Sequence, residues 1–319
     1  MAVLVGIDEA GFGPILGPLV VSSSTFSLPS RLVKADLWQV LQKSVGKKRK
    51  RLAGRLLITD SKKAYSKSLG IKHLQRTVLA CLRCLYKQPE SLTELLTMLS
   101  PDSLERLQTY PWYKEADNYL ISTEQADMAI ASSVVKSDLA SNGIELLTVR
   151  SCCLDVAYYN KMMDNVKNKA TVLFTATSQL IKTAFDNFGS KELQIIIDRQ
   201  GGRVRYRKNL QRMFPAMELK ILRESTAHSS YELRTKSKKM RLHFVVEADD
   251  HFLPVSLASM LSKYVRELLV DNINRYFARF HTGLRPTAGY WKDGLRFIHD
   301  VKTNLPHIKF DTNQLIRCR

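Results

Sequence analysis

Apolar runs of strand length recur along the chain, and turn-forming or charged residues bound each of them. Residues 3–7 and 19–21 are apolar, and the stretch between them is rich in glycine and proline. This pattern predicts two paired strands joined by a turn whose backbone approaches its neighbours closely. Residues 55–66 predict a strand that runs into a polar loop, and residues 193–198 predict a buried strand that ends on Asp198.

Helical periodicity appears in residues 71–86 and 170–189, the second closed by Gly189. Residues 90–141 predict several helices broken by prolines and carry no chemical motif, so we interpret residues 88–141 as a helical insertion. Residues 242–269 predict a strand, a turn with adjacent acids and then a long helix.

Charge changes this picture of an ordinary globular chain. The 319 residues can form one large domain or two, and 45% of them are apolar. The chain has 49 Lys and Arg against 30 Asp and Glu, a net charge of +19. Such an excess favours a polyanionic partner, most commonly nucleic acid, although solvated basic faces are the alternative.

The remaining composition disfavours two classes of protein, membrane-spanning proteins and secreted proteins held by disulfides. The sequence has no apolar window of membrane-spanning length and no basic leader followed by a cleavable apolar segment. Its five cysteines are an odd number without a disulfide framework. We therefore expect a soluble, cytoplasmic protein without a membrane partner.

Basic residues concentrate in two segments. Residues 199–241 hold 13 Lys or Arg against three Glu, and such a strip would neutralise a phosphate backbone well. A solvated ribbon is the alternative for this segment. Residues 46–51, GKKRKR, form a second basic patch that resembles a localisation signal only weakly.

Acidic residues stand at the ends of three predicted strands: Asp8 and Glu9, then Asp198, then Asp249 with Asp250. If these strands are neighbours, the acids meet at one edge of the sheet, although many strands end in acids without any such role. Gathered carboxylates cannot all stay ionised without cations between them. Two Mg²⁺ or Mn²⁺ ions roughly 3.5–4 Å apart would suit phosphodiester hydrolysis there.

Several motifs resemble the ribonuclease HII family, in the family's order. Residues 6–20, GIDEAGFGPILGPLV, are similar to its signature D-E-A-G-R-G-P-L-x-G-P-V. The later matches are TDSKKAYS at 59–66, IIIDRQGG at 195–202, SLASMLSKYVRE at 256–267 and, more loosely, TAGYWKDGLRFI at 287–298. The resemblance covers roughly the first 75 residues and the blocks around 145–200 and 243–298.

The resemblance implies one ribonuclease-H-like α/β domain over residues 1–319, with a mixed central sheet flanked by helices. The helical insertion at about 88–141, a basic insertion at about 199–241 and a C-terminal helical region at about 253–319 would complete it. It also implies a monomeric endonuclease that uses two Mg²⁺ or Mn²⁺ ions. The enzyme would cleave the RNA strand of RNA–DNA hybrids or ribonucleotides embedded in DNA, leaving a 3′-hydroxyl and a 5′-phosphate.

By the same resemblance, the catalytic and metal-binding acids fall on Asp8, Glu9, Asp198 and Asp249. The motif lysine Lys263 selects Asp249 over Asp250, because family helices place the last acid fourteen residues before it. Asp250 and Glu247 remain neighbours that could assist Asp249.

The resemblance also implies substrate contacts. The backbone of Gly11, Phe12 and Gly13 would approach the ribose 2′-hydroxyl and its phosphate, and Tyr290 would pack near the sugar, with a core aromatic as the alternative. The remaining substrate-binding positions are Ser61, Lys62, Lys63, Ser259 and Lys263. Ser256, Ser259, Lys263 and Arg266 would share one face of the long helix and point toward the acids or phosphate, with a surface face without a role as the alternative.

Three features depart from the family pattern. Phe12 replaces an arginine, 51 positions separate Asp198 from Asp249, and the helical insertion has no family counterpart. These departures keep two other functions open: a nucleic-acid-binding homologue with weak or no catalysis, and a nuclease for another structured nucleic acid.

Overall fold

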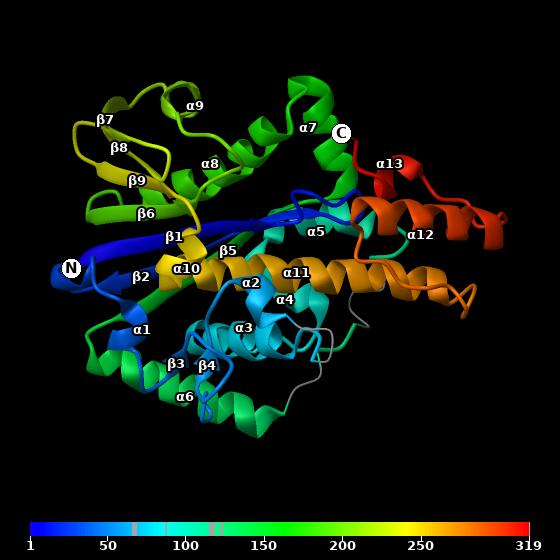
Figure 1. Cartoon of the computed structure of the whole chain (residues 1–319), viewed down its shortest axis with the longest axis horizontal. Coiled ribbons are helices and arrows are strands. Elements are labelled where there is room, and N and C mark those ends of the chain that lie inside the picture. The colour runs from blue at the N-terminus through cyan, green and yellow to red at the C-terminus, as the bar shows by residue number, and fades with distance from the viewer. Residues whose placement is uncertain (66–68, 87, 115–118, 122–123, 319) are drawn as a thin grey trace.

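A seven-stranded mixed sheet forms the centre of the molecule (Figure 1). The computed structural model describes residues 1–65, 69–86, 88–114, 119–121 and 124–318. In spatial order the strands are β5 (Glu145–Leu154), β2 (Leu19–Leu28), β1 (Ala2–Ala10), β6 (Glu192–Asp198), β9 (Lys239–Val245), β8 (His228–Arg234) and β7 (Glu218–Glu224). β1, β6 and β9 run parallel, and every other neighbouring pair in this sheet is antiparallel. The predicted class, a mixed sheet flanked by helices, is confirmed.

Helices cover both faces of this sheet (Figure 1). The described helices are α1 (Leu37–Val40), α2 (Ser61–Ala64), α3 (Lys72–Leu85), α4 (Leu92–Leu99), α5 (Pro101–Gln108), α6 (Gln125–Ser141), α7 (Val156–Val166), α8 (Lys169–Phe188), α9 (Arg207–Met213), α10 (Ala248–His251), α11 (Leu253–Ala278), α12 (Trp291–Asn304) and α13 (Thr312–Leu315), with a short 3₁₀ turn at Ser30–Leu32. The periodic segments around 71–86, 170–189 and 253–269 are therefore helical, as predicted.

Alternation along β1 divides the apolar core in two. Val3, Val5 and Ile7 lie in a cluster with α8, whereas Leu4 lies in a second cluster with α11, α3 and α6. This is the period of two that a strand covered on both faces requires. β1 and β2 are thus buried between two helical layers, and α11 lies directly against both strands.

The start of α11 lies unusually close to β1. A Cβ atom at Gly6 would stand 2.1 Å from the carbonyl carbon of Pro254 and 2.3 Å from the nitrogen of Val255, so only glycine allows this approach. The Ser24 hydroxyl donates a hydrogen bond to the Pro254 carbonyl at 2.7 Å. Two strands therefore fix the first turn of the long helix.

The helices expected within residues 90–141 are present as α4, α5 and α6. The Ser91 side chain caps α4, and Pro101 occupies the first turn of α5. Apolar side chains of all three helices, including Leu95, Leu107 and Leu139, lie in the same cluster as α11. That this segment is an insertion stays a prediction.

The basic segment 199–241 is more regular than a solvated ribbon. It contains α9, β7, β8 and the start of β9, and so supplies one edge of the sheet. The inward side chains Tyr231, Leu233 and Leu242 are fully buried, whereas most of β7 is exposed. β7 and β8 were not predicted because β7 is mostly exposed and β8 buries Ser229 and Ser230 beside Tyr231 and Leu233, so neither strand shows a clear apolar alternation.

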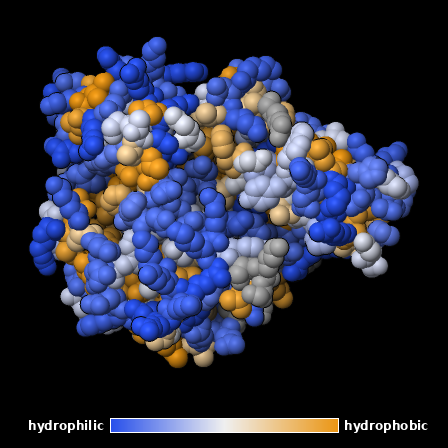
Figure 2. Space-filling model, in the orientation of Figure 1, coloured by the Kyte–Doolittle hydropathy of each residue, from blue (hydrophilic) through white to orange (hydrophobic). Residues whose placement is uncertain are grey.

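A second, two-stranded sheet joins β3 (Val45–Gly46) and β4 (Leu56–Leu57), which run parallel. Hydrophilic residues cover most of the face seen in Figure 2. Within the described residues, no helix combines the length and the apolar character needed to cross a membrane.

Candidate active site

The predicted acids gather at one edge of the sheet. β1, β6 and β9 are parallel neighbours, so their carboxyl ends lie side by side. Asp8 and Glu9 lie near the end of β1, Asp198 ends β6, and Asp249 lies in the first turn of α10, just after β9. The Ala248 N–H donates to Asp198 Oδ1 at 2.7 Å, which ties α10 to the end of β6.

Burial and mutual repulsion raise the pKa of the two acids on β1. Asp8 is only 7% exposed, and burial, followed by the charges of Glu9 and Asp198, holds its pKa well above the ordinary value. Burial and the Asp198 charge raise the pKa of Glu9 to about 8, although the positive charge of Lys62 opposes this. Both carboxyls thus lie in a site that disfavours a second negative charge.

The acids from the other two chain segments behave alike. Burial raises the pKa of Asp198, while the hydrogen bond from Ala248 and the charge of Lys62 lower it. Burial raises the pKa of Asp249 to about 7, and the charges of Asp60 and Asp198 add to this effect. The four predicted acids therefore lie close enough to repel one another.

Asp60 is an additional acid at this site that the sequence reasoning missed. Its Oδ1 accepts from the Lys62 N–H at 2.9 Å and so caps the N-terminus of α2. After burial, its negative charge is the largest influence on the pKa of Asp249. The available signal was its place in the TDSKKAYS motif, directly before Ser61.

The two lysines of α2 differ in their partners. Lys63 Nζ donates to both carboxylate oxygens of Asp250, at 2.5 and 2.6 Å, and this bond raises the pKa of Lys63 and lowers that of Asp250. Within the described residues, the exposed side chain of Lys62 forms no hydrogen bond or ion pair. Glu247 is exposed, and Asp250 is paired with Lys63, so we assign neither to the acid cluster.

Serines on α11 hold the elements of the site together. The Ser259 and Ser61 hydroxyls lie 3.1 Å apart, and Ser262 donates to the Asp8 carbonyl at 3.0 Å. Ser256 donates to the carbonyl of Asp249. Two members of the predicted polar stripe, Ser256 and Ser259, therefore face α10 and α2 rather than solvent, and Ser262, outside that stripe, faces β1.

Lys263, the third member of the predicted stripe, has a different neighbour. Its Nζ lies 2.6 Å from Glu267 Oε1 and 5.3 Å from the centre of the Tyr65 ring. Its charge is thus already paired with a carboxylate one helical turn away on α11.

The glycine turn after β1 contains two glycines in different environments. Gly11 has φ +93°, and a Cβ atom there would stand 2.6 Å from the Pro18 carbonyl oxygen and 2.7 Å from Arg266 Nε. Gly13 is exposed, and a Cβ atom there would meet nothing within 4 Å. The fold itself therefore requires Gly11, whereas the space above Gly13 is free for a ligand.

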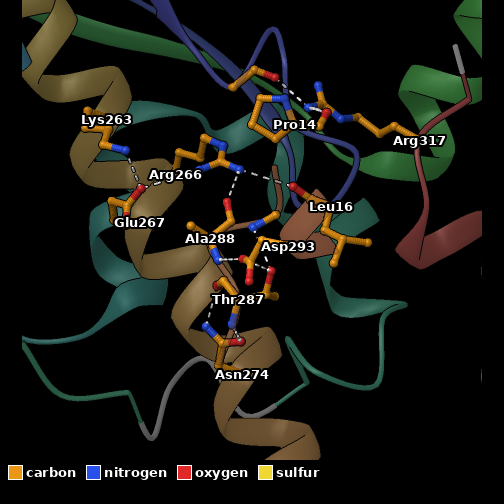
Figure 3. A network of polar contacts seen from close by, with 12 residues as sticks. Pro14, Leu16, Lys263, Arg266, Glu267, Asn274, Thr287, Ala288, Asp293 and Arg317 are labelled. Carbon is orange, nitrogen blue, oxygen red and sulfur yellow. Dashed lines mark hydrogen bonds and ion pairs between the residues drawn. The ribbon is translucent and has the colours of Figure 1, made fainter. Parts of the chain in front are cut away.

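Two buried arginines donate hydrogen bonds to the backbone of this turn (Figure 3). Arg317 Nη2 donates to the carbonyls of Gly11, at 2.5 Å, and Pro14. Arg266 Nη2 donates to the carbonyls of Leu16, at 3.2 Å, and Ala288, at 3.0 Å. Arg317 was not predicted, because nothing in a residue so distant along the chain indicates contact with the turn.

Two aromatic residues border the turn. Phe12 is partly buried and packs against the cluster that contains α8. Tyr290 follows Gly289, whose carbonyl accepts from the Ile15 N–H at 2.8 Å. Tyr290 is 52% exposed, so the alternative of a core aromatic is wrong.

The acid cluster fits a divalent cation in charge and donor type. Carboxylate oxygens are the ligands that Mg²⁺ and Mn²⁺ prefer, and a cation would relieve the repulsion that raises each pKa. Among the residues that the structure describes, however, no three His, Cys, Asp or Glu side chains are arranged to hold a metal ion. The donor type therefore supports a metal site, whereas the arrangement of the described side chains does not by itself define one.

Comparisons with known proteins give distant similarities only. No protein-family model matches the chain, and no curated protein matches it. RNase HII from Archaeoglobus fulgidus, solved as a complex with PCNA, has a TM-score of 0.46 and 15% identity over 99% of this chain and 94% of its own. Bst-RNase HIII in complex with Mn²⁺ has a TM-score of 0.42 and 12% identity over 99% of this chain and 66% of its own.

Ribonuclease H2 from Pyrococcus horikoshii OT3 has a TM-score of 0.40 and 12% identity over 98% of this chain and 92% of its own. None of these TM-scores reaches 0.5, so the functional proposal below rests on the residues of the site.

Proposed function

We propose that this protein is a metal-dependent endonuclease that hydrolyses the RNA strand of RNA–DNA hybrids or ribonucleotides embedded in DNA, with a 3′-hydroxyl and a 5′-phosphate as products. One observation carries this proposal. Asp8, Glu9, Asp198 and Asp249, from three separate chain segments, meet in a partly buried cluster where each pKa is raised. The ordered motifs in the sequence support the same chemistry.

The four acids would hold Mg²⁺ or Mn²⁺. When bound, such ions supply the positive charge that phosphodiester hydrolysis needs at the attacking and leaving oxygens. The raised pKa values mean that the carboxyls retain protons more readily in the metal-free protein. Cation binding would therefore release protons, which makes it pH-dependent.

Residues around the acids would position the substrate. The exposed Gly13 leaves space for a ribose beside the turn, and its backbone N–H is a group that can recognise a 2′-hydroxyl. Lys62 is exposed next to the acids and can neutralise a phosphate. The half-exposed ring of Tyr290 offers an apolar face to the sugar.

Two residues modify this assignment. Phe12 supplies no cation, so phosphate recognition at the turn would depend on backbone N–H groups alone. Lys63 is bound to Asp250 and would have to leave this partner to contact a phosphate. We therefore assign phosphate contact to Lys62 first.

The test is a cleavage assay with end-labelled duplexes: DNA with one ribonucleotide, a continuous RNA–DNA hybrid, double-stranded RNA and plain DNA, each with Mg²⁺, Mn²⁺ or EDTA. We expect metal-dependent cleavage only where a ribonucleotide strand pairs with DNA. Asp198→Asn should abolish cleavage but keep the fold, because an amide oxygen still accepts the bond from Ala248. Asp250→Asn, which leaves the four acids intact, should keep most of the activity.

Preserved turnover in Asp198→Asn would overturn the proposed site. Tight binding of the hybrid without cleavage in either metal would instead identify a nucleic-acid-binding protein. A Mn²⁺ titration of the wild-type protein and Asp198→Asn, followed calorimetrically, separates loss of the metal site from loss of substrate binding.

A further inference from the structure

A loop of consecutive basic residues lies next to the candidate site. Residues 47–51, KKRKR, connect β3 to the segment before β4, and all five side chains are exposed. Five adjacent positive charges repel one another, so a loop of this composition needs either free solvent or a polyanion around it.

Hydrogen bonds fix the base of this loop. The Arg55 side chain donates to the carbonyls of Leu52, at 2.9 Å, and Arg51, at 2.5 Å. Arg76, held by Asp127 through two bonds of 2.8 and 2.9 Å, donates to the Gly54 carbonyl at 2.9 Å. The loop therefore has a defined attachment rather than being a free tail.

Two of the five basic residues attach the loop to the site. Lys47 Nζ donates to the backbone carbonyl of Asp250 and lies 4.7 Å from the centre of the Trp38 ring. Arg49 Nη2 donates to the carbonyls of Lys63 and of Tyr65, the latter at 2.6 Å. These contacts reach α10 and the end of α2, the two elements that carry Asp249 and Lys62.

The other three basic residues are available. Within the described chain, the side chains of Lys48, Lys50 and Arg51 form no hydrogen bond or ion pair, and all three are exposed. The contacts of Lys47 and Arg49 attach the loop that carries these three residues to α10 and the end of α2, beside the acid cluster. The cluster itself repels phosphate, so adjacent cations are needed to bring a polyanion close.

We propose that residues 47–51 form a phosphate-binding arm that holds the backbone of a polynucleotide beside the acid cluster. Lys47 and Arg49 position the arm, and Lys48, Lys50 and Arg51 contact phosphates outside the cleavage point. The arm rests on the proposed function for its place beside the site, but it recognises the backbone and not the sugar. It therefore binds duplexes regardless of sequence.

The test compares Lys48→Ala/Lys50→Ala/Arg51→Ala with the wild-type protein. Binding of a fluorescein-labelled RNA–DNA hybrid is followed by anisotropy in EDTA, which prevents cleavage, over a series of KCl concentrations. Because each lost phosphate contact reduces the slope of log K against log [salt] by about 0.9, we expect a reduction of about 2 to 3 and a loss of affinity of about tenfold or more at low salt.

Two control variants make the result specific. Lys136→Ala/Lys302→Ala/Lys309→Ala removes the same charge from exposed lysines outside the loop and should leave the salt slope almost unchanged. Lys48→Arg/Lys50→Arg/Arg51→Lys keeps the charge of the loop and should retain the wild-type slope. Thermal unfolding of each variant confirms that it is folded.

The outcomes separate this inference from the proposed function. Suppose that the wild-type protein cleaves the hybrid, but the loop variant and the control lysine variant show the same dependence of log K on log [salt]. The phosphate-binding arm is then wrong and the proposed function stands. If the protein binds duplexes through the loop without cleaving any, the arm stands and the function is wrong. An unchanged affinity of the loop variant for every duplex would overturn the phosphate-binding arm. The basic loop would then be a candidate for recognition by another protein.

Discussion

At the scale of single residues, chemistry and fold make different demands on neighbouring positions. Gly11 is fixed by its positive φ and by the close Pro18 carbonyl, whereas Gly13 has open space around it. Lys63 is paired with Asp250, whereas the Lys62 side chain forms no hydrogen bond or ion pair within the described residues and acts on Glu9 and Asp198 through its charge alone. The motifs in the sequence list these residues side by side, and only the contacts separate structural from functional positions.

Alanine substitutions at the two glycines should therefore affect different properties, stability at Gly11 and cleavage at Gly13. Gly11→Ala should lower the free energy of unfolding by about 2 kcal/mol or more, because the new Cβ is strained and meets backbone. Gly13→Ala should change it by less than about 0.5 kcal/mol but reduce cleavage, since the methyl group enters the space proposed for the ribose. Urea unfolding and the cleavage assay measure the two effects. Equal stability losses would contradict the description of the turn.

The two lysines of α2 give a second residue-scale prediction. Lys62→Ala should weaken binding of the hybrid more than Lys63→Ala. Lys63 must leave Asp250 before it meets a phosphate, whereas the Lys62 side chain forms no hydrogen bond or ion pair within the part of the chain that the structure describes. Lys63→Ala breaks an exposed ion pair, which costs at most about 1 kcal/mol of stability. Anisotropy titrations in EDTA compare the two variants. A larger loss for Lys63→Ala would show that its bond to Asp250 opens when substrate binds.

At the scale of elements, the sequence predicted what depends on local pattern. β1, β2, β6, α3, α8 and α11 follow from apolar periodicity and glycine or proline boundaries. β7 and β8 were missed because β7 is mostly exposed and β8 buries serines as well as apolar residues, which weakens the apolar alternation. The acids on β1, β6 and α10 were found from the ordered motifs, but Asp60 was not assigned, although it lies within one of them. Arg317 was missed because contact between the turn and a segment at the opposite end of the sequence has no local signal.

That contact between segments can be tested directly. An isolated bridge joins Leu16 to Ile316, and Arg317 donates to the carbonyls of Gly11 and Pro14. Arg317→Ala leaves both carbonyls without this donor and should cost about 1–3 kcal/mol of stability. Amide hydrogen exchange within residues 11–17 should accelerate. Arg317→Lys keeps the charge but not the planar fork, so its stability and its exchange rates should lie between those of the wild-type protein and Arg317→Ala. Unchanged exchange in both variants would show that the turn does not depend on this arginine.

At the scale of the whole molecule, the acid cluster links folding to pH and to cations. The carboxyls have ordinary pKa values of 3.8 and 4.5, which burial and repulsion raise to about 7 in Asp249 and about 8 in Glu9. At a pH between the ordinary and the raised pKa values, the folded protein binds more protons than the unfolded chain. Stability therefore falls as pH rises, by up to about 1.4 kcal/mol per pH unit for each such carboxyl.

In EDTA, this contribution is complete below the ordinary pKa values and is lost as pH rises through about 7 to about 8. Glu9→Gln removes one of these groups, so its stability should fall less steeply with pH than that of the wild-type protein. Saturating Mn²⁺ should stabilise the wild-type protein most at the alkaline end, where the carboxylates are free to bind it, and should stabilise Glu9→Gln less. Urea unfolding across this pH range, with EDTA or Mn²⁺, measures both effects. Parallel pH profiles for the two proteins in EDTA would mean that Glu9 is already ionised and that the cluster does not oppose its charge.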